Sequence, residues 1–209
     1  MATAKLSAEV VILDCDGVMF DTTLANQAFY NQILAHFGRP PMSSEQFQFA
    51  HMHTVFESID YLFAAHRELI ESAHAYRQTL SYLTFVDMMQ IEPDLKPLLN
   101  AIRPHKKAAV ATNRTDTMTA VLSTHGLEGL FDMVVTALDV ERPKPAPDEL
   151  EKILVHFDLA PAQALYVGDS TVDQQAAAAA QIPFVAYSNR SLSAHLHIER
   201  LGQLKPHLV

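Results

Sequence analysis

Hydrophobic residues near the start of the chain form a short uninterrupted run. Residues 10–13 read VVIL, and the run stops abruptly at Asp14. A run of β-branched residues and leucine without polar alternation is typical of a parallel strand that is buried on both faces. We therefore predict a first strand at residues 10–13, with a polar turn at its carboxyl end.

The region from Thr23 to about Gln90 has a different pattern. Apolar residues recur at spacings of three and four over residues 24–37 and 55–71, and Pro40 and Pro41 interrupt the pattern between these stretches. This periodicity is typical of amphipathic helices, and the prolines mark a break between them. We expect an all-helical module here.

After Pro93, helical and strand patterns alternate. One expected helix ends at residue 102, and three others span residues 115–125, 148–157 and 172–180. The expected strands span residues 108–111, 133–137, 164–167 and 183–186. The tail from Ser188 onward contains two helix-like fragments. This alternation predicts βαβ units and therefore an α/β fold with a parallel, doubly wound sheet.

The first strand completes the predicted sheet, so the helical module is an insertion. We predict a core of residues 1–21 and 92–209, with residues 22–91 inserted after the first strand. The length of 209 residues suits one sizeable core with a smaller inserted module. A hydrophobic content of 49% and a charged content of 19% lie in the ordinary globular range.

Charge and cysteine content narrow the functional classes. The formal net charge of −9 disfavours a nucleic-acid partner, which usually requires a basic face. No window approaches the roughly 18 to 20 apolar residues of a membrane span, and residues 1–14 lack a signal-peptide core. The single cysteine, Cys15, excludes an internal disulfide framework and fits a reducing compartment, so we expect a cytoplasmic protein.

Polar residues with complementary chemistry follow four of the predicted strands. They are Asp14 and Asp16, Thr112 and Asn113, Lys144, and Asp169 with Asp173. Ligands of open parallel sheets bind beyond the carboxyl ends of the strands, where these residues would meet. Several carboxylates at one crevice repel one another unless a cation lies among them. Oxygen-only ligands favour a hard ion, and we predict Mg²⁺ beside a lysine and a hydroxyl that suit a phosphoryl group.

These residues lie in four segments that resemble the motifs of the haloacid dehalogenase superfamily of aspartyl-nucleophile phosphatases. The segments are residues 11–18 (VILDCDGV) with Asp21, residues 110–113 (VATN), residues 144–148 (KPAPD) and residues 167–173 (VGDSTVD). They occur in the family's order, each at a predicted strand end. The resemblance covers the whole chain and implies a Rossmann-like core with an inserted helical cap.

The resemblance also implies catalytic roles. Asp14 would be the nucleophile that forms an aspartyl phosphate, and Asp16 would protonate the leaving alcohol and then activate water. Such a division of labour suits an ionised carboxylate bound to Mg²⁺ and a neighbouring carboxyl that does not ligate through its side chain.

Binding roles follow from the same resemblance. Lys144 and the Thr112 hydroxyl would hold the transferring phosphoryl oxygens, with amides around Gly17 and Asn113 as further donors. The implied Mg²⁺ ligands are the Asp14 side chain, the Asp16 carbonyl and Asp169, with Asp173 as a direct or nearby carboxylate.

The expected activity is a Mg²⁺-dependent phosphohydrolase acting on a small phosphorylated metabolite. The aspartate at position 16 favours phosphate esters or anhydrides over dehalogenation and phosphonate cleavage. Residues 168–170 (GDS) and the trailing Asp173 resemble the phosphoglycolate phosphatase branch most. Alternatives are a sugar phosphomutase, a pyrophosphatase or nucleotide phosphatase, and a binding protein that keeps the fold without activity.

Several residues also have simpler structural interpretations. Thr112 could cap the following helix, Lys144 could be a solvated loop lysine, and Asp173 could interact with a helix dipole. Cys15 is expected to fill the core rather than react.

Two departures from the family pattern stand out. Residues 180–183 read AQIP where an Ala-Gly pair is usual, so Gln181 either adopts a left-handed backbone or the helix ends differently. Residues 142–143 (RP) replace a glycine that commonly precedes the lysine.

Overall fold

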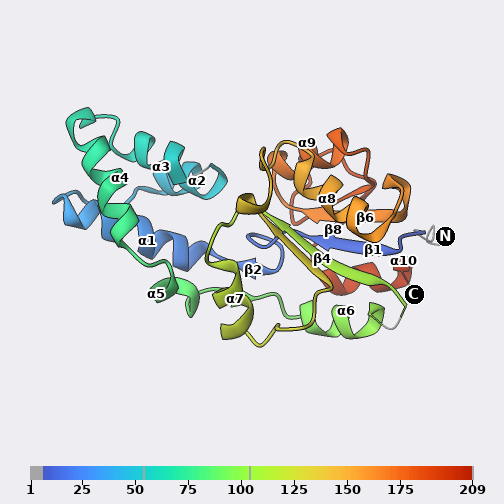
Figure 1. The fold of residues 1–209 in the computed structure, drawn as a ribbon. Helices are drawn as coiled ribbons and strands as arrows, with labels where there is room; N and C mark the ends of the chain where they lie inside the picture. Colours follow the sequence, from blue (N-terminus) through green and yellow to red (C-terminus); the bar gives the residue numbers. More distant parts are fainter. Residues whose placement is uncertain (1–6, 54, 104, 209) are drawn as a thin grey trace. The chain divides into compact units, whose positions relative to one another are not determined.

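The computed structural model describes residues 7–53, 55–103 and 105–208 (Figure 1). The chain divides into two compact units. One comprises the described residues of 1–21 and 91–209, and the other the described residues of 22–90.

The first unit contains a six-stranded sheet with the spatial order β5-β4-β1-β6-β7-β8. Every adjacent pair is parallel, which confirms the predicted α/β fold with a parallel sheet. The strands are β1 (Val10–Leu13), β4 (Lys107–Thr112), β5 (Met133–Thr136), β6 (Ala164–Gly168), β7 (Phe184–Tyr187) and β8 (Leu196–Ile198). The strand order reverses at β1, because β4 and β5 lie on one side of it and β6 to β8 on the other.

Helices cover both faces of this sheet. On one face, α8 (Asp148–Phe157) packs against β4 and β5, and α9 (Thr171–Ala179) packs against β6 and β7. On the other, α6 (Leu95–Ile102) packs beside the 3-10 turn Leu201–Leu204 and α10 (Lys205–Leu208), as Figure 1 shows. Two further 3-10 turns span Ala137–Asp139 and Pro161–Gln163.

The packing of the sheet explains why its strands read as apolar runs. Val10 and Ile12 of β1 are fully buried and join one hydrophobic cluster with Tyr166 of β6 and Leu150 of α8. Val11 and Leu13, which point the other way along the strand, are also buried. Burying such a side chain stabilises the fold by roughly 1.5 to 3 kcal/mol, so both faces anchor β1 at the centre of the sheet.

Two elements of this unit differ from the sequence prediction. The tail contains β8, which pairs with β7, where we expected only helix-like fragments. Its three residues are too few to show a strand period. The helix expected at residue 115 begins instead at Met118, as α7 (Met118–Thr124). The Arg114 N–H donates to the Thr112 hydroxyl at 3.2 Å and the Arg114 carbonyl accepts from the Ala137 N–H at 3.0 Å, so this segment is held as a loop.

The turn after α9 shows which backbone conformation Gln181 adopts. Gln181 has φ +58°, so it adopts the left-handed conformation that glycine would take without strain. The helix ends in hydrogen bonds from the Gln181 and Ile182 amides to the carbonyls of Ala178 and Ala177. The chain therefore keeps the left-handed helix end with glutamine in place of glycine.

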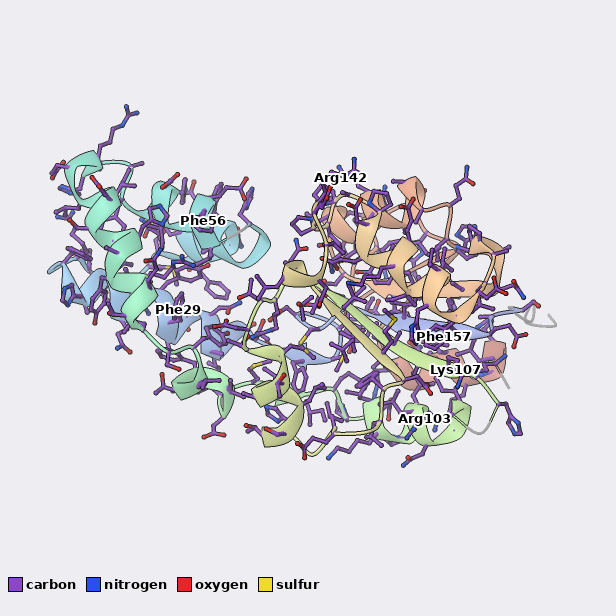
Figure 2. All side chains as sticks on the ribbon, viewed as in Figure 1. Phe29, Phe56, Arg103, Lys107, Arg142 and Phe157 are labelled. Carbon is purple, nitrogen blue, oxygen red and sulfur yellow. The ribbon has the colours of Figure 1, made fainter. Side chains whose placement is uncertain are left out.

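Regular structure over the described residues of 22–89 is helical, as predicted. The helices are α1 (Thr23–His36), α2 (Ser44–Met52), α3 (Val55–Leu62), α4 (Ile70–Thr79) and α5 (Leu83–Val86), with a 3-10 turn at Arg67–Leu69. Buried residues of this unit include Phe29, which lies among its helices (Figure 2), and Ile59. The single amphipathic stretch expected over residues 55–71 is wrong, because α3 ends at Leu62 and a turn separates it from α4.

A second sheet consists of two short strands, β2 (Phe20–Asp21) and β3 (Gln90–Ile91). These strands lie at the points in the sequence where the helical segment begins and ends. None of the helices in the described part of the chain has the length and apolar character of a membrane-spanning segment.

Candidate active site

The carboxyl ends of β1, β4 and β6 bring the predicted site residues together. β1 lies between β4 and β6, so Asp14 follows the central strand while Thr112 ends β4. The Asp14 N–H donates to the Val167 carbonyl of β6 at 3.0 Å, which continues the strand pairing up to the site. The reversal of strand order at β1 makes this the position where open α/β sheets bind ligands.

Lys144 occupies the centre of a buried polar network. Its Nζ lies 2.8 Å from Oδ1 of Asp14 and 2.8 Å from Oδ1 of Asp173. It also donates to the Tyr166 hydroxyl at 2.9 Å and to the Ala111 carbonyl at 3.1 Å. With its side chain 2% exposed, Lys144 is not the solvated loop lysine of the simpler interpretation. Burial works against its charge, but Asp14 and Asp173 outweigh burial and raise the pKa of Lys144 well above its usual value.

Asp173 uses both carboxylate oxygens within this network. Its Oδ1 accepts from Lys144 and, at 2.6 Å, from the Tyr166 hydroxyl. Its Oδ2 accepts from the Ser170 hydroxyl at 2.5 Å, while the Ser170 hydroxyl accepts from the Asp173 N–H and caps α9. Burial acts to raise the pKa of Asp173, but Lys144 and the hydrogen bonds outweigh it and lower the pKa. The helix-start interpretation therefore holds alongside the contact with Lys144.

Three carboxylates converge beside Lys144. Single oxygens of Asp14, Asp169 and Asp173 lie within 4.8 Å of one another. Burial raises the pKa of Asp14 well above its usual value, against the opposing charge of Lys144, and burial with the nearby Asp173 raises the pKa of Asp169 to about 7. With all three carboxylates ionised, they exceed the single ammonium by two negative charges, and the raised pKa values of Asp14 and Asp169 reflect the cost of burying this excess without a cation. The oxygen-only set therefore fits a hard divalent cation.

Gly17 makes room for this cluster. Its φ of +77° lies in the region that favours glycine. A Cβ at this position would lie 2.0 Å from Oδ2 of Asp169, a distance that no pair of non-bonded atoms can adopt. The glycine in the first motif therefore lets the turn after Asp14 approach the carboxylate that follows β6.

Asp16 lies outside the Lys144 network and pairs with Arg114. The guanidinium donates to both carboxylate oxygens, from Nη2 to Oδ1 at 2.6 Å and from Nε to Oδ2 at 2.7 Å. The Arg114 Nη1 also donates to the Thr117 hydroxyl at 3.3 Å. The sequence prediction missed Arg114, although its place two residues after Thr112, beyond a strand end, was a usable signal.

Thr112 and Asn113 have different surroundings. Thr112 is 1% exposed and its hydroxyl accepts from the Arg114 N–H. The N-cap interpretation of Thr112 is wrong, because α7 begins only at Met118. The exposed Asn113 donates its side-chain amide to the Lys144 carbonyl at 2.9 Å, which ties together the loops after β4 and β5.

Comparison with known proteins identifies the family. Residues 11–187 match the haloacid dehalogenase-like hydrolases. The chain belongs to this family. Pyrophosphatase PpaX of Bacillus thuringiensis (strain Al Hakam) is 29% identical over 177 residues, covering 80% of this chain and 77% of that protein.

Solved structures extend the comparison. A hydrolase of the same superfamily, subfamily IA variant 1, from Geobacter sulfurreducens PCA is 38% identical, with a TM-score of 0.82 and coverage of 92% of this chain and 95% of that one. A protein assigned as a phosphoglycolate phosphatase from Lactobacillus plantarum has a TM-score of 0.82 at 19% identity, covering 95% and 99%. At that identity the second likeness concerns the fold alone.

Two further residues of the hydrolase contribute to the site and were missed from the sequence. Tyr166 lies within the apolar run of β6, where it resembled another core residue. Glu149 at the start of α8 is fully buried, and burial raises its pKa to about 7 against the opposing charge of Lys144. Cys15 is also buried, and burial raises the pKa of its thiol, which suits the packing role expected for it.

Proposed function

We propose that this hydrolase is a Mg²⁺-dependent phosphatase that acts on a small phosphorylated metabolite through an aspartyl phosphate at Asp14. The observation that carries the proposal is the position of Asp14, which contacts Lys144 and shares a carboxylate cluster with Asp169 and Asp173. Such a site offers a nucleophile, a cation for phosphoryl oxygens and ligands for a hard metal ion.

The residues suited to hold Mg²⁺ are Asp14 and Asp169 through their side chains and Asp16 through its main-chain carbonyl. Asp173 supports them from the same cluster, because both of its oxygens already accept hydrogen bonds. When bound, Mg²⁺ would offset the two excess negative charges and stabilise charge on the transferring phosphoryl oxygens.

Each protein residue then has a defined task. The Asp14 carboxylate attacks phosphorus, and the bond from phosphorus to the leaving oxygen breaks. The Asp16 carboxyl gives its proton to that oxygen and later accepts a proton from the water that hydrolyses the aspartyl phosphate. Lys144 and the Thr112 hydroxyl, both buried at the site, hold the transferring oxygens.

The helical unit would act as the cap that the family resemblance implies, excluding water and shaping the substrate pocket. The acidic chain and its single buried cysteine support a cytoplasmic enzyme without a nucleic-acid partner. Phosphoglycolate is the first substrate to examine, because residues 168–170 and Asp173 resemble that branch. Pyrophosphate is the second, because PpaX relatives match 80% of the chain.

The decisive experiment is a substrate panel with release of inorganic phosphate as the readout. It would include phosphoglycolate, pyrophosphate, sugar phosphates and nucleoside monophosphates, each with Mg²⁺ and with EDTA. We expect phosphate release from at least one of them with Mg²⁺ and none with EDTA. Turnover in EDTA would contradict the proposed metal dependence. A sugar phosphate that isomerises without releasing phosphate would indicate a mutase, and inactivity on the whole panel would favour a binding protein.

A further inference from the structure

The pairing of Arg114 with Asp16 places a positive charge beside the proposed general acid. The guanidinium makes two hydrogen bonds to the Asp16 carboxylate, at 2.6 and 2.7 Å, in the bidentate geometry that suits planar oxyanions. Its third nitrogen donates to the Thr117 hydroxyl at 3.3 Å. The plane of the guanidinium is therefore fixed from two sides.

This pairing occupies the carboxyl that the reaction needs. A general acid must direct one oxygen toward the leaving atom, within hydrogen-bond reach. In the structure both Asp16 oxygens accept from Arg114 instead. The Arg114 side chain is 9% exposed and the Asp16 side chain 35% exposed, so solvent reaches the pair mainly from the Asp16 side. An oxyanion that approaches from that side can take the place of the Asp16 carboxylate.

Lys144 is not a substitute for Arg114 in binding the rest of the substrate. Its ammonium contacts Asp14 and Asp173 and is 2% exposed, so its position suits the transferring phosphoryl group. A group carried by the leaving alcohol would lie on the other side of the scissile bond, next to Asp16. Arg114 is the cation that contacts Asp16 there.

We propose that Arg114 determines specificity by binding an oxyanion carried by the leaving group, either a carboxylate or a phosphate. That oxyanion takes the place of the Asp16 carboxylate on the guanidinium, and Asp16 becomes free to face the leaving oxygen. A substrate with an anionic leaving group thus makes its own general acid available, whereas a neutral one leaves Asp16 paired. This inference rests on the proposed phosphatase function and adds the substrate class and the residue that selects it.

Three substrates test the exchange. Phosphoglycolate carries a carboxylate, pyrophosphate has a phosphate leaving group, and 2-hydroxyethyl phosphate has the size of phosphoglycolate but a neutral leaving group. We expect Arg114→Met to lower kcat/KM for the preferred anionic substrate roughly 10- to 100-fold, the size of a lost pair of charge-assisted hydrogen bonds. Turnover of 2-hydroxyethyl phosphate should stay the same or rise, because Asp16 is no longer held. Whichever of the two anionic substrates is affected more identifies the oxyanion.

The conservative variant and a matched control keep the test independent of folding. Arg114→Lys keeps the charge without the bidentate geometry, so its loss should lie between those of wild type and Arg114→Met. Arg142 makes the same kind of two-bond pair with Asp148, but its side chain is 71% exposed at the surface (Figure 2). Arg142→Met should keep the wild-type ratio of kcat/KM for the anionic substrate to kcat/KM for the neutral one. If Arg114→Met does not fold, Arg114→Lys decides by the same ratio.

Two results would overturn the inference. One is a wild-type enzyme that does not prefer an anionic leaving group over 2-hydroxyethyl phosphate. The other is an Arg114 variant whose kcat/KM falls by the same factor on all three substrates. A purely structural role of Arg114 would leave the ratio between the substrates unchanged in this way. Failure of the proposed function looks different, since wild type would then release no phosphate even from p-nitrophenyl phosphate, whose leaving group needs no acid.

Discussion

The site residues form two polar assemblies that differ in burial. The Lys144 network (Lys144, Asp14, Asp173 and Tyr166) is almost completely buried, and each of its carboxylates contacts Lys144 directly. The Arg114 pair (Arg114 and Asp16) is open on one side, with Asp16 35% exposed and Arg114 9% exposed. Buried charges are costly to leave unpaired, whereas partly solvated pairs exchange partners at little cost. The network therefore suits a fixed position for the transferring phosphoryl group, and the pair suits a contact that changes with the substrate.

The largest effect should come from the nucleophile of the Lys144 network. Asp14→Asn keeps the shape of the side chain but removes the charge that attacks phosphorus, so kcat should fall at least about a thousand-fold. Phosphate release under Mg²⁺ measures the change, and mass spectrometry should detect an aspartyl phosphate in wild type only. The matched control is Asp158→Asn at the exposed end of α8, where φ is +54° and asparagine is well tolerated. Wild-type turnover by Asp14→Asn would exclude Asp14 as the nucleophile.

Replacing Lys144 should show how much the buried Lys144 network contributes to the free energy of unfolding. Lys144→Met leaves Asp14 and Asp173 without their shared partner, so the free energy of unfolding should drop by about 3 to 5 kcal/mol. Urea denaturation in EDTA measures this without a contribution from metal binding. Lys107→Met is the control, because Lys107 pairs with Asp132 at 3.4 Å while 55% exposed, and its loss should cost about 1 kcal/mol or less. Equal losses in both variants would show that the Lys144 network contributes no more than a surface pair.

The pH dependence of the metal-free protein should follow from Asp169, together with Asp14 and Glu149, whose pKa values burial also raises. The pKa of Asp169 is raised from 3.8 to about 7, so the native state holds a proton that the unfolded state has released. That stabilisation is complete below about pH 4 and is lost as the pH rises through 7, amounting to at most about 4 kcal/mol. Asp173, with its lowered pKa, acts in the opposite direction and only below about pH 4. Urea midpoints in EDTA between pH 4 and 8 test this.

Two comparisons sharpen the pH experiment. Asp169→Asn should make the decline between pH 4 and 7 smaller, with the remainder coming from Asp14 and Glu149. Saturating Mg²⁺ should also reduce the decline in wild type, because the ion favours charged carboxylates. Stability of the metal-free wild type that rises over this interval would contradict the raised pKa of Asp169.

The sequence was most informative where strand patterns and polar residues coincide. Runs such as residues 10–13 identified buried parallel strands, and the residues after them meet because parallel strands place their carboxyl ends at one edge. Asp14, Lys144 and Asp173 could thus be grouped from the sequence alone. The contacts between them could not be predicted, because the spacing of residues along the sequence does not show which side chains of neighbouring strands point toward one another. Tyr166 is the clearest case, since its hydroxyl is hidden within an apolar strand.

Other features were hidden for different physical reasons. The edge strand β8 has three residues and no full period, and the helical stretch over residues 55–71 breaks at a turn that lacks proline and glycine. The pairing of Arg114 with Asp16 joins residues 98 positions apart, and only the adjacency of β1 and β4 brings them together. Local patterns thus predicted which residues reach the site, while sheet order decided which of them touch.

The smallest effect concerns the stability contributed by the Arg114 pair. Arg114 is 9% exposed, but its loss in Arg114→Met leaves Asp16, which is 35% exposed, in contact with water, so the free energy of unfolding should fall by about 1 to 2 kcal/mol, below the loss for Lys144→Met. Urea denaturation in EDTA compares the two variants directly, with Arg142→Met expected to match wild type. A loss as large as that of Lys144→Met would mean that the guanidinium is a fixed structural partner of Asp16. A small loss of stability combined with a changed substrate preference is what an exchangeable contact requires, because the free energy that holds Asp16 must be low enough for a substrate oxyanion to replace it.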